Sequence, residues 1–165
     1  MKIHRVQHKN LYNLFTLILK QNDLSDMACD AVAAHLLEAN LRGVDSHGCQ
    51  QILGYANSLQ SGRIRTNAKI RLIEQKKAVS LLDADGAIGH YAGKEAMELC
   101  IQEAKEYGIA HVTVINSNHF GMAGHFAQMA AKQKLVGFAT SDTNVVDLVP
   151  YGGTAPKLGN NPYAW

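Results

Sequence analysis

The sequence has little of what marks the specialised classes of protein. Only 3 of its 165 residues are cysteine and only 3 are proline, and the formal net charge is +2. The basic residues are scattered and their excess is small, so we expect no nucleic-acid partner. Apolar runs break well before the roughly 20 residues that span a bilayer, so no transmembrane helix is expected.

Several short motifs are also missing. Cys29, Cys49 and Cys100 form no Cys-x-x-Cys pair, and the N-terminus has no apolar signal-peptide core, which together favour a reducing cytoplasm. The histidines show no His-Glu-x-x-His spacing, so no metal site is predicted, and His35 is interpreted as a packed, hydrogen-bonded residue. Without a G-x-G-x-x-G or Walker pattern, the glycines of residues 83–89 are interpreted as a turn and not as a phosphate-binding loop.

The first part of the chain is predicted to be helical. Apolar residues recur with the period of an amphipathic helix over about residues 6–20, and again after Ser25, which is a suitable N-cap. A third helical pattern follows Asp45 and Ser46, either of which could cap it. These patterns define a predicted N-terminal helical segment, residues 1–66.

Beyond that segment, short runs of apolar residues alternate with longer helical patterns. The alternation predicts a mixed α/β layer with parallel or mixed strands over residues 67–165. Glycine-lined turns at residues 150–154 and 158–165 are expected to be buried and to lead into a further apolar element, so we expect a truncated chain with an incomplete layer. The predicted strands lie near residues 70–72, 79–81, 112–115 and 136–139, and the predicted helices cover residues 91–107 and 125–134.

Two histidines lie where chemistry is expected. His119 follows the β-branched run of residues 112–115 in a polar loop, and a helical pattern begins after it. Loops at the carboxyl ends of strands in open α/β sheets often bind ligands, because helix N-termini and backbone amides converge there. His47 lies beside Gly48 in a second polar break. A helix corner capped by Ser46 would explain the serine but not His47.

Four blocks of residues together resemble the type-2 malate/L-lactate dehydrogenase family, the non-Rossmann NAD(P)-dependent oxidoreductases. They are Arg42-Gly-Val-Asp-Ser-His-Gly48, Asn116-Ser-Asn-His-Phe-Gly121, Pro150-Tyr-Gly-Gly153 and Gly159-Asn-Asn-Pro162, in the family's order. The resemblance runs along the whole chain. It implies the family's α/β fold, here incomplete, NAD or NADP as cofactor, a small-molecule 2-hydroxy or 2-oxo acid as substrate, and a homodimer.

The resemblance also implies which residues act. His47 and His119 are expected to be catalytic: one exchanges a proton with the substrate oxygen, which suits the near-neutral pKa of histidine, and the other polarises or orients the carbonyl. Ser46, Gln51 and Asn118 are expected to contact the substrate. Many relatives have an arginine at the position of Gln51, and glutamine cannot supply the charge with which arginine holds a carboxylate. The identity of the acid is therefore not predicted.

The remaining expectations concern the nucleotide and the rival hypotheses. Thr143, with Ser141 and Asp142, is expected to contact NAD or NADP. One rival is a catalytically inactive fragment that serves at most as a dimerisation or binding remnant, which the end of the chain at Trp165 and the presence of Gln51 support. Another, a metal-dependent hydrolase, is poorer because no histidine or carboxylate recurs at ligand spacing.

Overall fold

The computed structural model of the protein describes residues 5–143 and 145–165. The chain forms two compact units: the N-terminal unit ends at Met122, and the C-terminal unit begins at Ala123. Among the described residues, no helix combines the length and the apolar character needed to cross a membrane. The boundary predicted at residues 66 and 67 is not tested by this division and stays a prediction.

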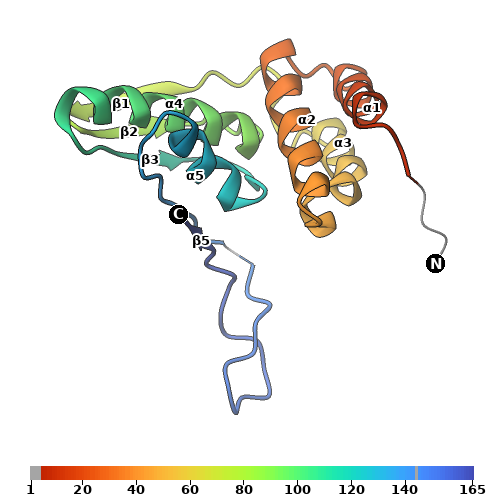
Figure 1. Ribbon diagram of the computed structural model, residues 1–165. Coiled ribbons are helices and arrows are strands. Elements are labelled where there is room, and N and C mark those ends of the chain that lie inside the picture. The colour runs from red at the N-terminus through yellow and green to blue at the C-terminus, as the bar shows by residue number, and fades with distance from the viewer. Residues whose placement is uncertain (1–4, 144) are drawn as a thin grey trace. The chain divides into compact units, whose positions relative to one another are not determined.

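Three helices open the N-terminal unit, α1 (His8–Lys20), α2 (Asp26–Leu41) and α3 (Ile52–Gln60). Helix α1 packs against both α2 and α3 (Figure 1). The predicted cap of the second helix is confirmed, because Ser25 Oγ accepts a hydrogen bond from the amide of Ala28 at 3.4 Å. The core between these helices consists of Phe15, Leu19, Leu24, Ala28, Cys29, Val32, Ala33, Leu36, Ile52, Tyr55, Leu59, Ile64 and Ile88.

The predicted cap of the third helix is wrong. Asp45 and Ser46 lie in a single 3₁₀ turn, η1 (Asp45–His47), and a second turn, η2 (Cys49–Gln51), precedes α3. The backbone of Gly48, with φ −102° and ψ −137°, separates the two turns and prevents one continuous helix. No side chain in the described part of the chain caps α3. The segment that carries His47 is therefore a compact corner, not the first turn of a helix.

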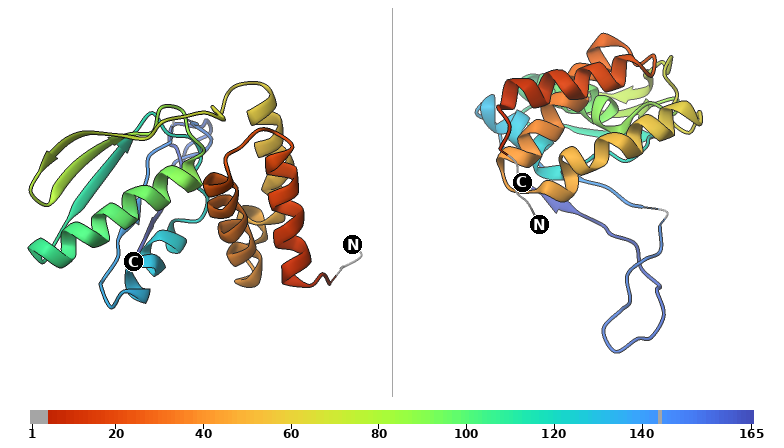
Figure 2. Two further views of the ribbon diagram at one scale, coloured as in Figure 1. Left: turned by 90° about the horizontal axis from the view of Figure 1, so that it is seen from above. Right: turned by 90° about the vertical axis from the view of Figure 1, so that its right-hand side faces the viewer.

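A three-stranded sheet completes the N-terminal unit. Strands β1 (Arg71–Lys76) and β2 (Val79–Asp83) are antiparallel, whereas β2 and β3 (His111–Ile115) are parallel. Helix α4 (Gly89–Tyr107) connects β2 to β3 and lies along one face of the sheet (Figures 1 and 2). The sheet contains both parallel and antiparallel pairs, as the predicted layer with parallel or mixed strands allows. Because β2 and β3 are parallel, their carboxyl ends and the loops that follow lie at the same edge.

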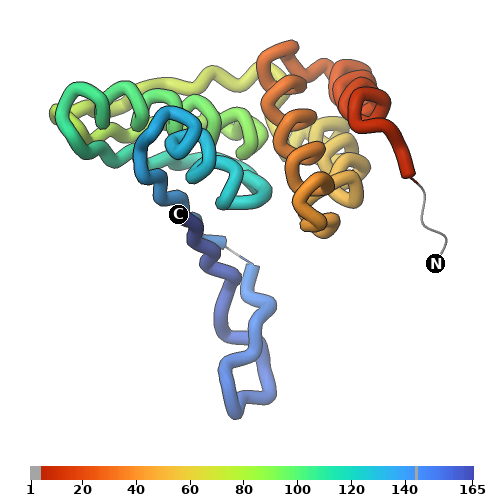
Figure 3. Tube along the Cα trace, in the orientation of Figure 1, coloured from red at the N-terminus to blue at the C-terminus, as the bar shows by residue number. Residues whose placement is uncertain are grey.

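The C-terminal unit contains α5 (Ala123–Lys132) and two short antiparallel strands, β4 (Ala139–Thr140) and β5 (Tyr163–Ala164). The strand predicted at residues 136–139 is wrong in its extent, because only residue 139 of that range pairs. After β4, residues 141–143 and 145–150 form one arm and residues 151–162 form another that returns to β5, and the two arms meet where Leu148 pairs with Leu158 (Figure 3).

The burial predicted for the glycine-lined turns of the C-terminal unit is also wrong. Tyr151 is fully exposed, and Leu158 and Trp165 are 52% and 79% exposed. The prediction rested on the apolar composition of these turns. Composition indicates which surface is poorly hydrated, but burial also requires a packing partner, and these side chains stay exposed.

Candidate active site

His119 lies in the loop of residues 116–122, here called the His119 loop, which follows the end of β3. Its first residue, Asn116, has a φ of 53°, in the left-handed region that asparagine tolerates better than most residues. Asn116 Nδ2 donates to Asp83 Oδ1 at 3.0 Å, which joins the ends of β3 and β2. The pKa of Asp83 lies below its usual value, chiefly because its carboxylate accepts a hydrogen bond from the backbone amide of Asp85 and next because it accepts one from Asn116. The Asp83 side chain that anchors the loop therefore stays ionised.

The middle of the His119 loop is held against the start of α4. Asn118 Nδ2 donates to the carbonyl oxygens of Gly86 and Ala87, both at 3.0 Å. A Cβ at Gly89 would lie 2.1 Å from the carbonyl oxygen of Asn118 and 2.5 Å from that of His119, so only glycine permits this approach. The observed contacts of Asn118 position the loop, and its expected contact with substrate stays a prediction.

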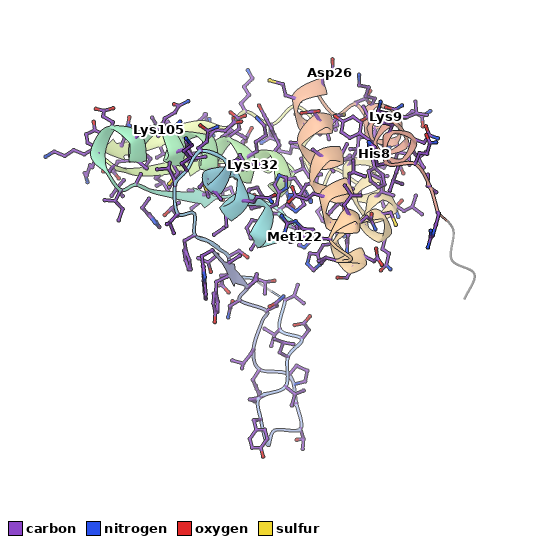
Figure 4. All side chains as sticks on the ribbon, in the orientation of Figure 1. His8, Lys9, Asp26, Lys105, Met122 and Lys132 are labelled. Atoms are coloured by element: carbon purple, nitrogen blue, oxygen red, sulfur yellow. The ribbon has the colours of Figure 1, made fainter. Side chains whose placement is uncertain are left out.

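The end of the loop is held by α2. The amide of Met122, which is labelled in Figure 4, donates to His35 Nε2 at 2.7 Å. His35 is fully buried, so its interpretation as a packed, hydrogen-bonded residue is confirmed. Gly121 has a φ of 81°, and a Cβ there would lie 2.5 Å from His35 Nε2 and 2.7 Å from His90 Nε2. The loop therefore needs a glycine at this position for both conformation and space.

His47 lies in a second irregular segment, residues 43–51, here called the His47 corner. Asn40 organises it from the end of α2: its Nδ2 donates to Asp45 Oδ1 and its Oδ1 accepts from the amide of Cys49, both at 2.7 Å. Gln51 Nε2 donates to the carbonyl oxygen of Ser46 at 2.7 Å. The observed role of Gln51 is thus to brace the corner, and its contact with substrate stays a prediction.

The structure brings the two predicted histidines together. The ring centroids of His47 and His119 are 5.8 Å apart, with the ring planes inclined at 38°. Ser46 Oγ lies 3.0 Å from His47 Nδ1, within hydrogen-bond distance. Two imidazoles at this separation can face one small ligand, so the arrangement permits one ring to exchange a proton while the other binds.

Behind His119 lie two residues that the sequence analysis missed. The hydroxyl of buried Tyr55, on α3, is 2.7 Å from His119 Nδ1 and 3.4 Å from His90 Nε2. His90, the second residue of α4, is 1% exposed. Tyr55 follows the His47 corner in an amphipathic helix, where its apolar neighbours conceal a polar role. For His90 the available signal was its place directly after a glycine-rich turn.

The surroundings of His119 set its charge. His119 is an exposed residue, but its ring lies beside those of Tyr55 and His90, and the partial loss of water lowers its pKa. A positive charge on nearby His47 lowers the pKa of His119 further. Burial raises the pKa of Tyr55, so its hydroxyl stays protonated across the neutral range. His119 is therefore mainly a neutral base at pH 7.

The three residues expected to contact the nucleotide lie in the C-terminal unit, whereas the expected catalytic and substrate residues belong to the N-terminal unit. Thr143 Oγ1 accepts from the amide of Val145 at 3.1 Å, and Asp142 Oδ1 accepts from the amide of Thr143 at 2.7 Å. A Cβ at Gly159 would lie 2.6 Å from Thr143 Cγ2. The turn of residues 141–143 is thus compact and packed on another block of the resemblance.

Metal ligands do not gather in the residues that the structure describes: no group of three or more histidine, cysteine, aspartate or glutamate side chains is placed to hold an ion. The chemistry that can be assigned from these residues is proton transfer and hydrogen bonding.

Comparison with known proteins identifies the family. Residues 6–165 match the family model described as malate/L-lactate dehydrogenase. The chain is 35% identical over 160 residues to a malate dehydrogenase from Pyrococcus horikoshii, which covers 97% of this chain and 44% of the relative. It is 32% identical over 156 residues to an L-sulfolactate dehydrogenase from Methanocaldococcus jannaschii, covering 94% of this chain and 45% of the relative.

Solved structures agree with the sequence matches. The malate dehydrogenase of Pyrococcus horikoshii superposes with a TM-score of 0.90 at 35% identity, over 97% of this chain and 46% of that one. The sulfolactate dehydrogenase of Methanocaldococcus jannaschii gives 0.91 at 31% identity, over 96% and 46%. The chain spans less than half the length of these relatives. The predicted α/β fold is therefore confirmed, and the chain contains only part of it. This chain belongs to the malate/L-lactate dehydrogenase family.

Proposed function

We propose that the chain carries the proton-transferring part of an NAD(P)-dependent dehydrogenase that interconverts 2-hydroxy and 2-oxo acids. The observation that carries the proposal is the pairing of His47 with His119, whose ring centroids are 5.8 Å apart. Oxidation of a 2-hydroxy acid removes a hydride from C2 and a proton from the hydroxyl oxygen, which leaves a carbonyl. The cofactor, when bound, takes the hydride, and a base on the protein must take the proton.

His119 is the proposed base. Its lowered pKa keeps the ring neutral at pH 7, and Nδ1 faces Tyr55, which leaves Nε2 for the substrate oxygen. In the reverse direction the protonated ring returns the proton to the oxygen as the carbonyl is reduced. His47, with Ser46 at 3.0 Å, is proposed to orient and polarise that oxygen.

The turn of residues 141–143 fits part of a dinucleotide. One oxygen of Asp142 accepts from the amide of Thr143, and the other remains available for ribose hydroxyls, the contact that acidic residues make in other dinucleotide sites. The turn contains no cation, and the negative charge of Asp142 disfavours a phosphate. We therefore assign Ser141, Asp142 and Thr143 to the ribose or carboxamide of NAD or NADP and not to its phosphates.

The proposed substrates are small 2-hydroxy and 2-oxo acids, the class to which the names of the relatives point. Gln51 presents a neutral amide whose nitrogen is bonded to Ser46, so it contributes no positive charge to a substrate carboxylate. The proposal also includes a cytoplasmic homodimer, which the family resemblance supports. Measurement of the molecular mass by light scattering tests the dimer, and a mass of one chain would overturn it.

Cofactor oxidation tests the proposed activity. The purified chain is mixed with NADH or NADPH and a panel of 2-oxo acids, beside a His47→Ala, His119→Ala double variant and a His111→Ala control. His111 is an exposed histidine on β3, which makes it a matched substitution outside the pair. We expect turnover in the parent and the control and none in the double variant. Equal turnover in all three would contradict the assignment.

A second function has one observation in its favour. The chain spans 44–46% of the length of the relatives that it matches. On that hypothesis the chain is an inactive fragment that binds ligand or a partner copy. A parent that is folded by circular dichroism and inactive with every acid, yet binds NADH, supports the fragment and excludes the dehydrogenase activity of this chain.

A further inference from the structure

We propose that His90, acting through the hydroxyl of Tyr55, fixes which nitrogen of His119 carries the proton. The three groups form a row, His119 Nδ1, Tyr55 OH and His90 Nε2, with separations of 2.7 and 3.4 Å. His90 is thus a positioning residue that acts through Tyr55. The catalytic consequence rests on the proposed function, but the position of the proton does not.

The hydrogen bonds along the row can run in either of two directions, here called its polarities, because the phenol of Tyr55 has one proton to donate. In the first, Tyr55 donates to His119 Nδ1 and accepts from His90, and the proton of neutral His119 is on Nε2. In the second, His119 Nδ1–H donates to Tyr55, which donates to His90 Nε2. Only the second leaves His119 Nε2 with a lone pair that can accept a proton from a ligand.

The charged form of His119 decides between them. Both ring nitrogens of an imidazolium carry protons, so Nδ1–H must find an acceptor, and the Tyr55 oxygen lies 2.7 Å away. The Tyr55 proton must then point elsewhere, and His90 Nε2 is the acceptor that the row offers. With the second polarity His119 gains and loses its Nε2 proton without any rearrangement behind it. With the first polarity every protonation would require Tyr55 and His90 to reverse.

The packing holds His90 in place for this role. Its ring meets that of His35 edge to face, with centroids 4.7 Å apart and planes at 87°, and meets Tyr55 at 5.0 Å and 77°. Aromatic rings favour this geometry, so two contacts fix the ring plane. A Cβ at Gly121 would lie 2.7 Å from His90 Nε2, so glycine leaves the space that this nitrogen occupies. A side chain at Gly121 would therefore displace the nitrogen that lies 3.4 Å from the Tyr55 hydroxyl.

Nuclear magnetic resonance measures the tautomer of His119 directly. Long-range proton–nitrogen correlation of the chain labelled with ¹⁵N-histidine, above the pKa of His119, separates the Nδ1–H form from the Nε2–H form. We expect the Nδ1–H form in the parent. An Nε2–H form in the parent overturns the proposal. This result needs no variant, so the test holds even if a variant fails to fold.

Four variants sharpen the test. In His90→Phe the ring is kept but the acceptor is lost, so Tyr55 donates to His119 and the proton shifts to Nε2. In His90→Gln an amide oxygen can accept, and the Nδ1–H form is retained. Tyr55→Phe removes the acceptor of Nδ1–H and also shifts the proton to Nε2. Tyr12→Phe removes a hydroxyl that bonds to Asp30 instead, and leaves His119 unchanged.

The variants that stay folded give two further outcomes. A folded His90→Phe chain in which His119 keeps the Nδ1–H form overturns the proposal. If the parent is active, His90→Phe lowers kcat roughly 10- to 100-fold, as partners that orient a histidine do, with little change in KM, and His90→Gln restores most of the loss. An inactive parent with the expected tautomers contradicts the proposed function of the chain and leaves the role of His90 intact.

Discussion

The His119 loop and the two arms of the C-terminal unit (residues 141–143 and 145–162) are irregular segments that follow a strand, but they are held in different ways. A side chain of α2, His35, accepts from the backbone of the His119 loop at Met122, and the loop's own Asn118 donates to the backbone of the turn before α4. The arms bond to each other where Leu148 pairs with Leu158, and their large apolar side chains are exposed. An irregular segment is fixed when its backbone groups find partners in a packed scaffold. By this criterion the His119 loop is built to position a side chain.

The largest expected effect of breaking the His119 loop is on activity. Replacing His119 with alanine removes the proposed base, and general acid–base catalysis contributes roughly 10²- to 10⁴-fold. We expect kcat for 2-oxo acid reduction to fall by that factor, with a smaller change in KM, as measured by steady-state NADH consumption. His111→Ala, on the strand before the loop, should retain the parent rate. A His119→Ala chain with full activity would show that the loop positions nothing that reacts.

Substitution of Gly121 tests the space that the loop leaves. Alanine there must adopt a φ of 81° at a cost of about 1–2 kcal/mol, and its Cβ would lie 2.5 Å from His35 Nε2. Overpacking adds typically about 1–3 kcal/mol. We expect urea denaturation to show a loss of roughly 2–5 kcal/mol in the free energy of unfolding.

Gly43 supplies the matched control for that substitution. Its φ is 74°, but none of the described atoms lies within 4 Å of a Cβ built there. Gly43→Ala should therefore cost only the conformational part, about 1–2 kcal/mol. Equal losses at Gly121 and Gly43 would mean that the two buried histidines give way, and that the loop is less tightly packed than the distances indicate.

The sequence predicted the regular elements of this fold because apolar residues recur with the period of the helix or strand they form. It drew attention to His47 and His119 because both lie in glycine-containing breaks of that period, and the family resemblance implied that they act. It did not predict Tyr55 and His90, whose polar atoms meet only after α3 and α4 have packed. Nor could it predict the exposure of Tyr151, because composition does not say whether a partner is present.

The pH dependence of turnover tests the electrostatics of the loop. The pKa of His119 lies below its ordinary value of 6.5, through loss of water and the charge of His47. Reduction needs the charged ring, so its kcat/KM should be highest below that pKa and fall about tenfold per unit as the pH rises through it. Oxidation needs the neutral ring and should rise to a plateau above the same pKa. An inflection above 6.5 that disappears in His119→Ala would contradict the assigned surroundings.

A smaller effect is expected in the His47 corner at Gln51. Gln51→Arg keeps a donor for the carbonyl oxygen of Ser46, which Gln51 now meets at 2.7 Å, and adds a positive charge. A hydrogen bond to a charged group contributes about 1.5–3 kcal/mol, and part of that is lost in holding a longer side chain. We expect KM for 2-oxo acids to fall roughly 3- to 10-fold with little change in kcat. Gln51→Lys, which cannot form two parallel bonds, should give less than half of that gain in binding free energy.

The smallest effect on stability is expected in the arms of the C-terminal unit. Tyr151 is fully exposed, and Gly152 beside it has a φ of 75° with none of the described atoms within 4 Å of a Cβ built there. Tyr151→Ser removes only solvated surface, so the free energy of unfolding should stay within about 0.5 kcal/mol of the parent value. Thermal unfolding of the two chains at several concentrations checks this. A loss that grows with protein concentration would mean that Tyr151 packs against a second copy, and that the arms, unlike the His119 loop, obtain their order from outside the chain.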